Sequence, residues 1–97
     1  MVNLLDPDTV TRKLAKLSGW TVSTDQKSIE KCYTFDSFPA AYAFMTRVAF
    51  LAERRNHHPD WRNVYKRVEV RLSTHDSGGL TQLDFDLAQA MERILGR

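Results

Sequence analysis

Three histidines are the side chains of this sequence best suited to proton transfer, and all of them lie between residues 57 and 75. An unperturbed histidine has a pKa of about 6.5, so it both accepts and donates protons near neutral pH. His57 and His58 form a doublet directly before Pro59, and His75 precedes a glycine-rich break. We therefore predict a pocket for acid–base chemistry that these histidines share.

Two other interpretations of the histidines remain open at this point. A doublet near the end of a helix is also typical of surface histidines, which the helix dipole favours there. A zinc site with three histidine ligands needs imidazoles that converge on one ion. Adjacent side chains such as His57 and His58 diverge, so we rank metal binding below acid–base work.

Two further residues near the histidines have a structural and a functional interpretation. Trp61 offers an aromatic surface on which a flat heterocycle could stack, or it belongs to the core. Asp84 lies three residues after Thr81, a spacing that predicts a capping box at the start of a helix. The same carboxylate could orient a neighbouring histidine, although the spacing alone favours the cap.

The elements that must position these residues can be located from caps and periodicity. Asp6 and Pro7 predict the start of a first helix, with Gly19 as a stop beyond it. Alternating residues at 20–23 and 29–35 around a polar turn predict a β-hairpin.

A second helix should begin near Pro39 and end by His58, because a proline disfavours the helical conformation of the residue before it. Apolar residues that recur every three or four positions predict the buried face of this helix, formed by Phe38, Ala41, Tyr42, Met45, Val48, Ala49 and Ala52.

The remainder of the chain predicts a second hairpin and a last helix. A third strand is expected from Val64, with a turn at residues 66–67 and an alternating strand through Leu72. Thr81 should cap the last helix. The order α-β-β-α-β-β-α predicts an α+β fold: a four-stranded antiparallel sheet with helices packed on one face.

Length and composition restrict the class of protein. With 97 residues, the chain is expected to form a single domain over residues 1–97. A net charge of +2, with acidic residues interleaved among the basic ones, argues against direct nucleic acid binding. One cysteine, Cys32, allows no internal disulfide, and no apolar stretch approaches membrane-spanning length. We expect a cytoplasmic protein that does not interact with membranes.

Several motifs taken together resemble one known family, the pterin-4a-carbinolamine dehydratases. The resemblance is dense over residues 42–88 and weaker before them. It rests on Ala52-Glu53, His57-His58-Pro59-x-Trp61, Asn63-Val64-Tyr65, Leu72-Ser-Thr-His75, Gly79-Leu80 and Asp84-x-x-Leu87-Ala88. One departure is Arg54, where the family often has lysine.

The resemblance implies an enzyme that dehydrates a 4a-hydroxytetrahydropterin, such as 4a-hydroxytetrahydrobiopterin, to the quinonoid dihydropterin in tetrahydrobiopterin recycling. It implies no metal and no organic cofactor. It places the catalytic histidines at His57, His58 and His75, and substrate-binding residues at Glu53, Trp61, Ser73, Thr74 and Asp84. Our hypothesis is that His57 and His75 transfer protons while His58 positions the substrate.

The resemblance also implies partners. Family members form homodimers and homotetramers, and an open antiparallel sheet usually pairs or covers its edges. The animal members double as a dimerisation cofactor of a homeodomain transcription factor, which implies a nuclear location in animals. The alternative function is therefore a dimerising adaptor, or transcriptional coactivator, whose pterin activity is vestigial.

Overall fold

In the computed structural model, which describes residues 3–97, two antiparallel hairpins build the sheet. Strands β1 (Thr21–Val22) and β2 (Ile29–Thr34) form the first hairpin, and β3 (Asp60–Val64) and β4 (Arg67–Leu72) form the second. The order β1-β2-β4-β3 joins the hairpins through their longer strands. Strands β1 and β3 are therefore the two edges of the sheet.

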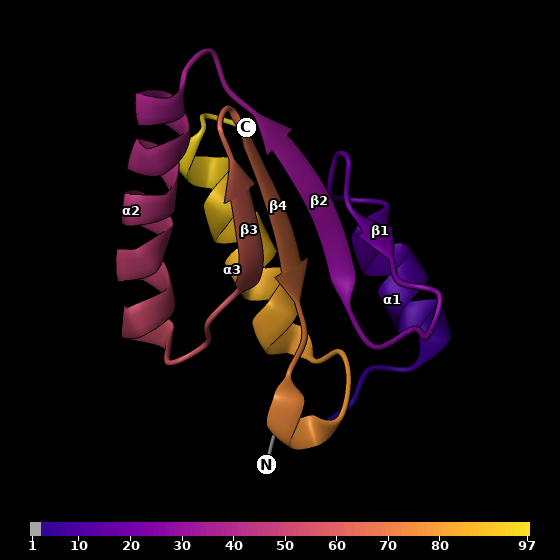
Figure 1. Ribbon diagram of the computed structural model, residues 1–97. Helices are drawn as coiled ribbons and strands as arrows, with labels where there is room; N and C mark the ends of the chain where they lie inside the picture. Colours follow the sequence, from indigo (N-terminus) through magenta and orange to yellow (C-terminus); the bar gives the residue numbers. More distant parts are fainter. Residues whose placement is uncertain (1–2) are drawn as a thin grey trace.

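Three α-helices cover one face of this sheet and leave the other face open (Figure 1). They are α1 (Pro7–Leu14), α2 (Phe38–Arg55) and α3 (Gln82–Ile94), and a short 3-10 helix, η1 (His75–Ser77), lies between β4 and α3. The predicted α+β fold and its α-β-β-α-β-β-α order are confirmed, with η1 as an unpredicted addition. The predicted domain also included residues 1 and 2, which lie outside the described range.

Local hydrogen bonds explain where the helices begin. The Asp6 carboxylate accepts a hydrogen bond from the backbone N–H of Thr9 at 2.8 Å, and Pro7 occupies the first turn of α1. The Ser37 hydroxyl accepts one from Ala40 at the start of α2. Thr81 and Asp84 form the predicted capping box of α3. These short polar caps satisfy N–H groups that have no partner within the helix.

The apolar core lies between the inner face of the sheet and the helices. Strand β4 turns Val68, Val70 and Leu72 inward, and each is at most 2% exposed. Its other side chains point to the open face, as the period of two predicts. The core of α3 centres on Phe85, Leu87 and Met91.

The predicted buried face of α2 was partly wrong. Ala41, Val48 and Ala52 are buried as expected, and Met45 is half-buried. Ala49 is exposed, however, and Phe38 and Tyr42 are 45% and 58% exposed. The buried face includes Phe44 instead. Apolar residues lie on two neighbouring faces of this helix, and spacing within the helix does not determine which of them packs on the sheet.

The predicted start of the third strand was also wrong. Strand β3 begins at Asp60, immediately after Pro59, and the turn lies at residues 65–66 instead of 66–67. Tyr65 adopts a left-handed backbone conformation with φ of 52°, and the Asn63 side chain donates to the carbonyl groups of Tyr65 and Arg67. The hydrogen bonds from Asn63 thus bridge a turn in which Tyr65 occupies a position that usually favours glycine or asparagine.

None of the described helices is both long enough and apolar enough to cross a membrane.

Candidate active site

The predicted histidines meet at one end of the sheet, where α2 ends, β4 ends and α3 begins. A cavity of about 420 Å³ lies there. It is lined by Asn56, His57, His58, Ser73, Thr74, His75, Asp76, Ser77 and Leu83. The structure thus brings all three histidines to a shared cleft, although they come from segments on either side of the second hairpin.

At the end of α2, the side chains of the two adjacent histidines point in different directions. Asn56 terminates the helix in the left-handed conformation, with φ of 50° and ψ of 43°. Asparagine tolerates this conformation better than most residues. The backbone N–H of His57 then donates to the carbonyl of Ala52 at 3.0 Å, which holds the first histidine against the helix end. His57 consequently turns inward while His58 points to solvent.

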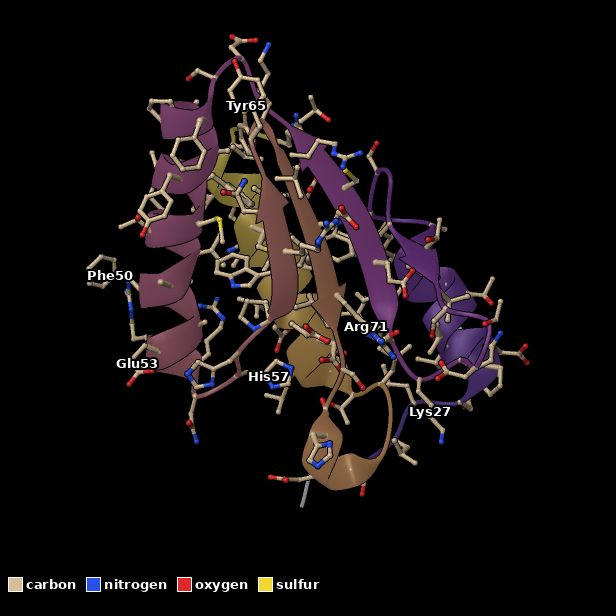
Figure 2. The ribbon with its side chains drawn as sticks, in the orientation of Figure 1. Lys27, Phe50, Glu53, His57, Tyr65 and Arg71 are labelled. Atoms are coloured by element: carbon tan, nitrogen blue, oxygen red, sulfur yellow. The ribbon has the colours of Figure 1, made fainter. Side chains whose placement is uncertain are left out.

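His57 is buried and paired with a carboxylate. Its side chain is 9% exposed, and Nε2 lies 2.6 Å from Oδ1 of Asp84, which is fully buried at the start of α3. Figure 2 shows His57 below the lower end of β3, next to α3. Both predicted roles of Asp84 are therefore present: it caps α3 and contacts a histidine.

Two threonines complete the surroundings of the Asp84 carboxylate. Oδ2 accepts hydrogen bonds from the Thr74 hydroxyl at 2.8 Å and from the backbone N–H of Thr81 at 2.9 Å. The hydroxyl groups of Thr74 and Thr81 lie 2.6 Å apart. Oδ2 thus accepts two hydrogen bonds, while Oδ1 faces His57.

His58 has an exposed environment. Its Nε2 lies 2.9 Å from Oε1 of Glu53, and the two side chains are 57% and 83% exposed. Glu53 does not line the cavity, so it reaches the site only through His58. An ion pair this exposed contributes little to stability.

His75 approaches the cleft from the opposite side. It is the first residue of η1, which follows an isolated bridge between Thr74 and Gly79. The neighbouring Ser73 hydroxyl donates to the carbonyl of Lys27 at 2.6 Å, which ties the end of β4 to the loop between β1 and β2. His75 itself is exposed and lines the cavity together with His57 and His58.

Trp61 is a third predicted site residue, besides Glu53 and Asp84, that does not line this cleft. It lies opposite Val70 in the β3–β4 pair and packs against the hydrophobic core. It also borders a separate cavity of about 490 Å³ with the charged residues of the open sheet face. Strand alternation turns the side chain of Trp61 toward the helices, and residues 57–59 separate its strand from α2.

Four cleft residues were not predicted as site residues: Asn56, Asp76, Ser77 and Leu83. Asn56 carried a local signal, because asparagine is enriched at left-handed helix ends. Asp76 and Ser77 could have been found as the neighbours of His75. Leu83 lies in the first turn of α3 and is half-buried at the cleft.

The described part of the chain holds no group of three or more His, Cys, Asp or Glu side chains arranged to bind a metal ion. The site instead combines a buried histidine–carboxylate pair with two exposed histidines around an open cavity. Such an arrangement can move protons to and from a bound polar molecule.

Comparison with known proteins identifies relatives over almost the whole chain. Residues 3–94 match the family model described as pterin 4 alpha carbinolamine dehydratase. A Bradyrhizobium sp. (strain BTAi1) protein is 52% identical over 94 residues, covering 97% of this chain and 95% of the relative. A Mesorhizobium japonicum protein is 51% identical, covering 95% and 94%. Both are named "Putative pterin-4-alpha-carbinolamine dehydratase".

A solved structure is similar as well. The crystal structure of a transcriptional coactivator/pterin dehydratase from Brucella melitensis matches with a TM-score of 0.92 at 37% sequence identity. The match covers 95% of this chain and 98% of that one.

Proposed function

The chain belongs to the pterin 4 alpha carbinolamine dehydratase family, and on that premise we propose that it dehydrates a 4a-hydroxytetrahydropterin by histidine acid–base catalysis. The product is the quinonoid dihydropterin, and the proposed physiological role is the recycling of tetrahydrobiopterin. The observation that carries the proposal is the buried His57–Asp84 pair in the wall of a cleft shared with His58 and His75.

The reaction needs two proton transfers and no electron acceptor. A general acid protonates the hydroxyl group on C4a, and the C4a–O bond breaks to release water. A general base removes the proton from the neighbouring ring nitrogen, and the electron pair of that N–H bond forms the new C=N bond. Acid–base groups are sufficient for this balance, so we propose that no metal or organic cofactor takes part.

The surroundings of the histidines suggest different roles for each. His57 is held in one orientation by Asp84 and suits proton transfer, because a fixed geometry avoids reorganisation during the reaction. His75 lines the same cleft and supplies the second proton-transfer group. His58 is exposed and paired with Glu53, which suits positioning of the substrate at the entrance.

The predicted substrate-binding residues also have different surroundings, which suggest different roles. Ser73 lines the cleft and suits direct contact with the pterin. Glu53 and Asp84 contact histidines, so we propose that they act through His58 and His57. Trp61 does not line the cleft. For Trp61 to contact the pterin, the bound substrate must extend from the cleft to strand β3.

The test is the dehydration rate of purified variants, measured by stopped-flow absorbance above the spontaneous rate. His57→Gln keeps a donor toward Asp84 but cannot transfer protons near neutral pH, so we expect a decrease of about tenfold or more. His75→Ala should give a similar decrease. His58→Ala is the comparison, with its larger effect expected on KM. Wild-type rates for both His57→Gln and His75→Ala would refute the catalytic proposal.

A second candidate function is a dimerising adaptor, and an exposed apolar surface favours it. On α2, Phe38, Tyr42 and Phe50 are 45%, 58% and 69% exposed. Figure 2 shows Phe50 projecting from α2 away from the sheet. Large apolar side chains exposed along one helix often mark a protein interface.

The sheet edges support self-association as well. Strand β3 is paired on one side only, and its free edge can pair with another strand. We propose that the protein forms a homodimer or homotetramer through these surfaces, and that an adaptor function would use the same surfaces for a transcription factor. Light scattering that gives only the 11.2 kDa monomer at micromolar concentration would contradict self-association. A partner that co-purifies with protein lacking dehydration above background would favour the adaptor.

A further inference from the structure

A chain of hydrogen bonds with one possible direction runs from α3 to the Asp84 carboxylate. The backbone N–H of Leu83 can only donate, and it donates to the Thr81 hydroxyl at 3.2 Å. The backbone N–H of Thr81 can only donate, and it donates to Oδ2 of Asp84. Thr74 gives its single hydroxyl proton to Asp84, so the proton between the two hydroxyl groups comes from Thr81.

This direction determines which protons remain available at the site. The single hydroxyl proton of Thr74 goes to Asp84, so Thr74 has none left to donate to a ligand. Oδ2 of Asp84 accepts two hydrogen bonds, which leaves Oδ1 for His57. An ionised carboxylate oxygen can only accept, so Nε2 of His57 must carry a proton.

We infer that Thr74 and Thr81 are positioning residues that, through Asp84, hold His57 with its proton on Nε2 and make Nδ1 the atom that exchanges protons with the substrate. Among the described residues, Nε2 is the ring nitrogen of His57 with a hydrogen-bonding partner. The ring lines the cleft, so the Nδ1 edge is the one left for a ligand. The catalytic part of the inference rests on the proposed dehydratase function.

Burial strengthens the argument for a positioning role. Thr74 is 7% exposed, while Thr81 and Asp84 are fully buried. Hydroxyl groups out of contact with water keep their hydrogen bonds in one arrangement, because no solvent molecule competes for them. The orientation of Asp84, and with it that of the His57 ring, is therefore set by Thr74, which was predicted to bind substrate, and by Thr81, which was predicted to cap a helix.

The first experiment examines the resting protein and needs no substrate. NMR of 15N-labelled protein distinguishes the two neutral forms of a histidine by which ring nitrogen carries the proton. We expect Nε2–H for His57 in the wild type, with that proton protected from exchange by its bond to Asp84. The Nδ1–H form would overturn the inference.

The second experiment compares Thr74→Val with Thr74→Ser, because Thr81 also caps α3 and its replacement would disturb the helix. Valine matches the shape of threonine without the hydroxyl, and serine keeps the hydroxyl. In Thr74→Val we expect the His57 Nε2–H proton to exchange about tenfold faster, the factor expected for loss of one hydrogen bond to a charged group. Thr74→Ser should retain protection. Equal exchange in all three proteins would overturn the positioning role.

The kinetic result separates positioning from substrate contact. A positioning residue acts on the chemical step, so Thr74→Val should lower kcat about tenfold with little change in KM, and Thr74→Ser should restore it. A raised KM with unchanged kcat would instead show that Thr74 binds substrate and would overturn the inference. If the wild type itself shows no dehydration, the proposed function fails, and the NMR experiments still decide the assignment of the His57 proton.

Discussion

Replacing Glu92 by glutamine tests the buried ion pair that joins α3 to the sheet, at a distance from the histidine cleft. Glu92 is 6% exposed, and its Oε2 accepts hydrogen bonds from the Lys31 ammonium at 2.8 Å and from the Tyr33 hydroxyl. Lys31 also donates to the carbonyl of Ser18 at 2.7 Å. The neutral amide of the glutamine side chain would leave a nearly buried ammonium without its counter-charge.

The pKa of Glu92 gives the direction of the pH dependence. Burial by itself raises this pKa, but the hydrogen bonds from Lys31 and Tyr33 and the charge of Lys31 outweigh it, so the pKa lies below its ordinary value. Tyr33 responds in the opposite sense: burial and the bond to Glu92 raise its pKa far above the usual value. A carboxyl group with a lowered pKa stabilises the fold above its unfolded pKa, about 4.3, and loses this contribution as the pH falls below that value.

The expected magnitude follows from burial. Removing one partner of a buried ion pair costs about 3 to 5 kcal/mol. The carbonyl of Ser18 and the Tyr33 ring, 4.7 Å from Lys31 Nζ, still contact the ammonium, so we expect the lower end, about 3 kcal/mol. For a domain of this size each kcal/mol shifts Tm by about 4 to 8 °C. Glu92→Gln should therefore lower Tm by about 12 to 24 °C at neutral pH.

The measurement is urea unfolding followed by circular dichroism at pH 7 and at pH 4. The difference between wild type and Glu92→Gln should shrink at the lower pH, because the unfolded wild type then binds a proton at Glu92 that the folded protein binds less readily. Glu69→Gln is the matched control: its partner Arg62 is 69% exposed, and loss of that exposed pair should cost less than about 1 kcal/mol. Equal urea midpoints for wild type and Glu92→Gln at pH 7, or a difference that does not change with pH, would refute the reasoning.

Three further predictions concern the site, the apolar surface and the strained turn. Asp84→Asn brings a side-chain N–H group close to His57, Thr74 and the backbone N–H of Thr81, which need an acceptor at this position. We therefore expect the dehydration rate to fall by about 10²-fold or more. A wild-type rate in stopped-flow assays would argue against the role of His57. Tyr42→Lys should lower the mass measured by light scattering if α2 forms the interface, with an unchanged circular dichroism spectrum; an unchanged mass would exclude that face. Tyr65→Asn should raise the free energy of unfolding by about 0.5 kcal/mol, because asparagine tolerates the left-handed conformation that tyrosine adopts there with φ of 52°; a lower urea midpoint would contradict this.

Features that depend on neighbouring residues in the chain were predictable from the sequence. The caps at Asp6 and Thr81 act within three residues of themselves, so their patterns already specify where α1 and α3 begin. Pro59 restricts the residue before it, and α2 does end ahead of the histidine doublet. The order of helices and strands follows from such local signals, and so does the position of all three histidines at the ends of elements.

Features that depend on distant residues were decided by the tertiary structure. Spacing along α2 could not tell that Phe44 is buried while Tyr42 is exposed, because the sheet selects the covered face. Spacing also could not tell which histidine of the doublet turns inward, since His57 finds its carboxylate 27 residues away.

The sequence therefore determines that three histidines are present and where they lie along the chain, and the fold determines the different surroundings of each. Acid–base capacity is a property of the imidazole itself and can be recognised from the sequence. The inequality between a buried His57 held by Asp84 and an exposed His58 beside Glu53 arises only when α2 and α3 pack together. Burial and long-range hydrogen bonds are properties of packed surfaces, and no local pattern of residues contains them.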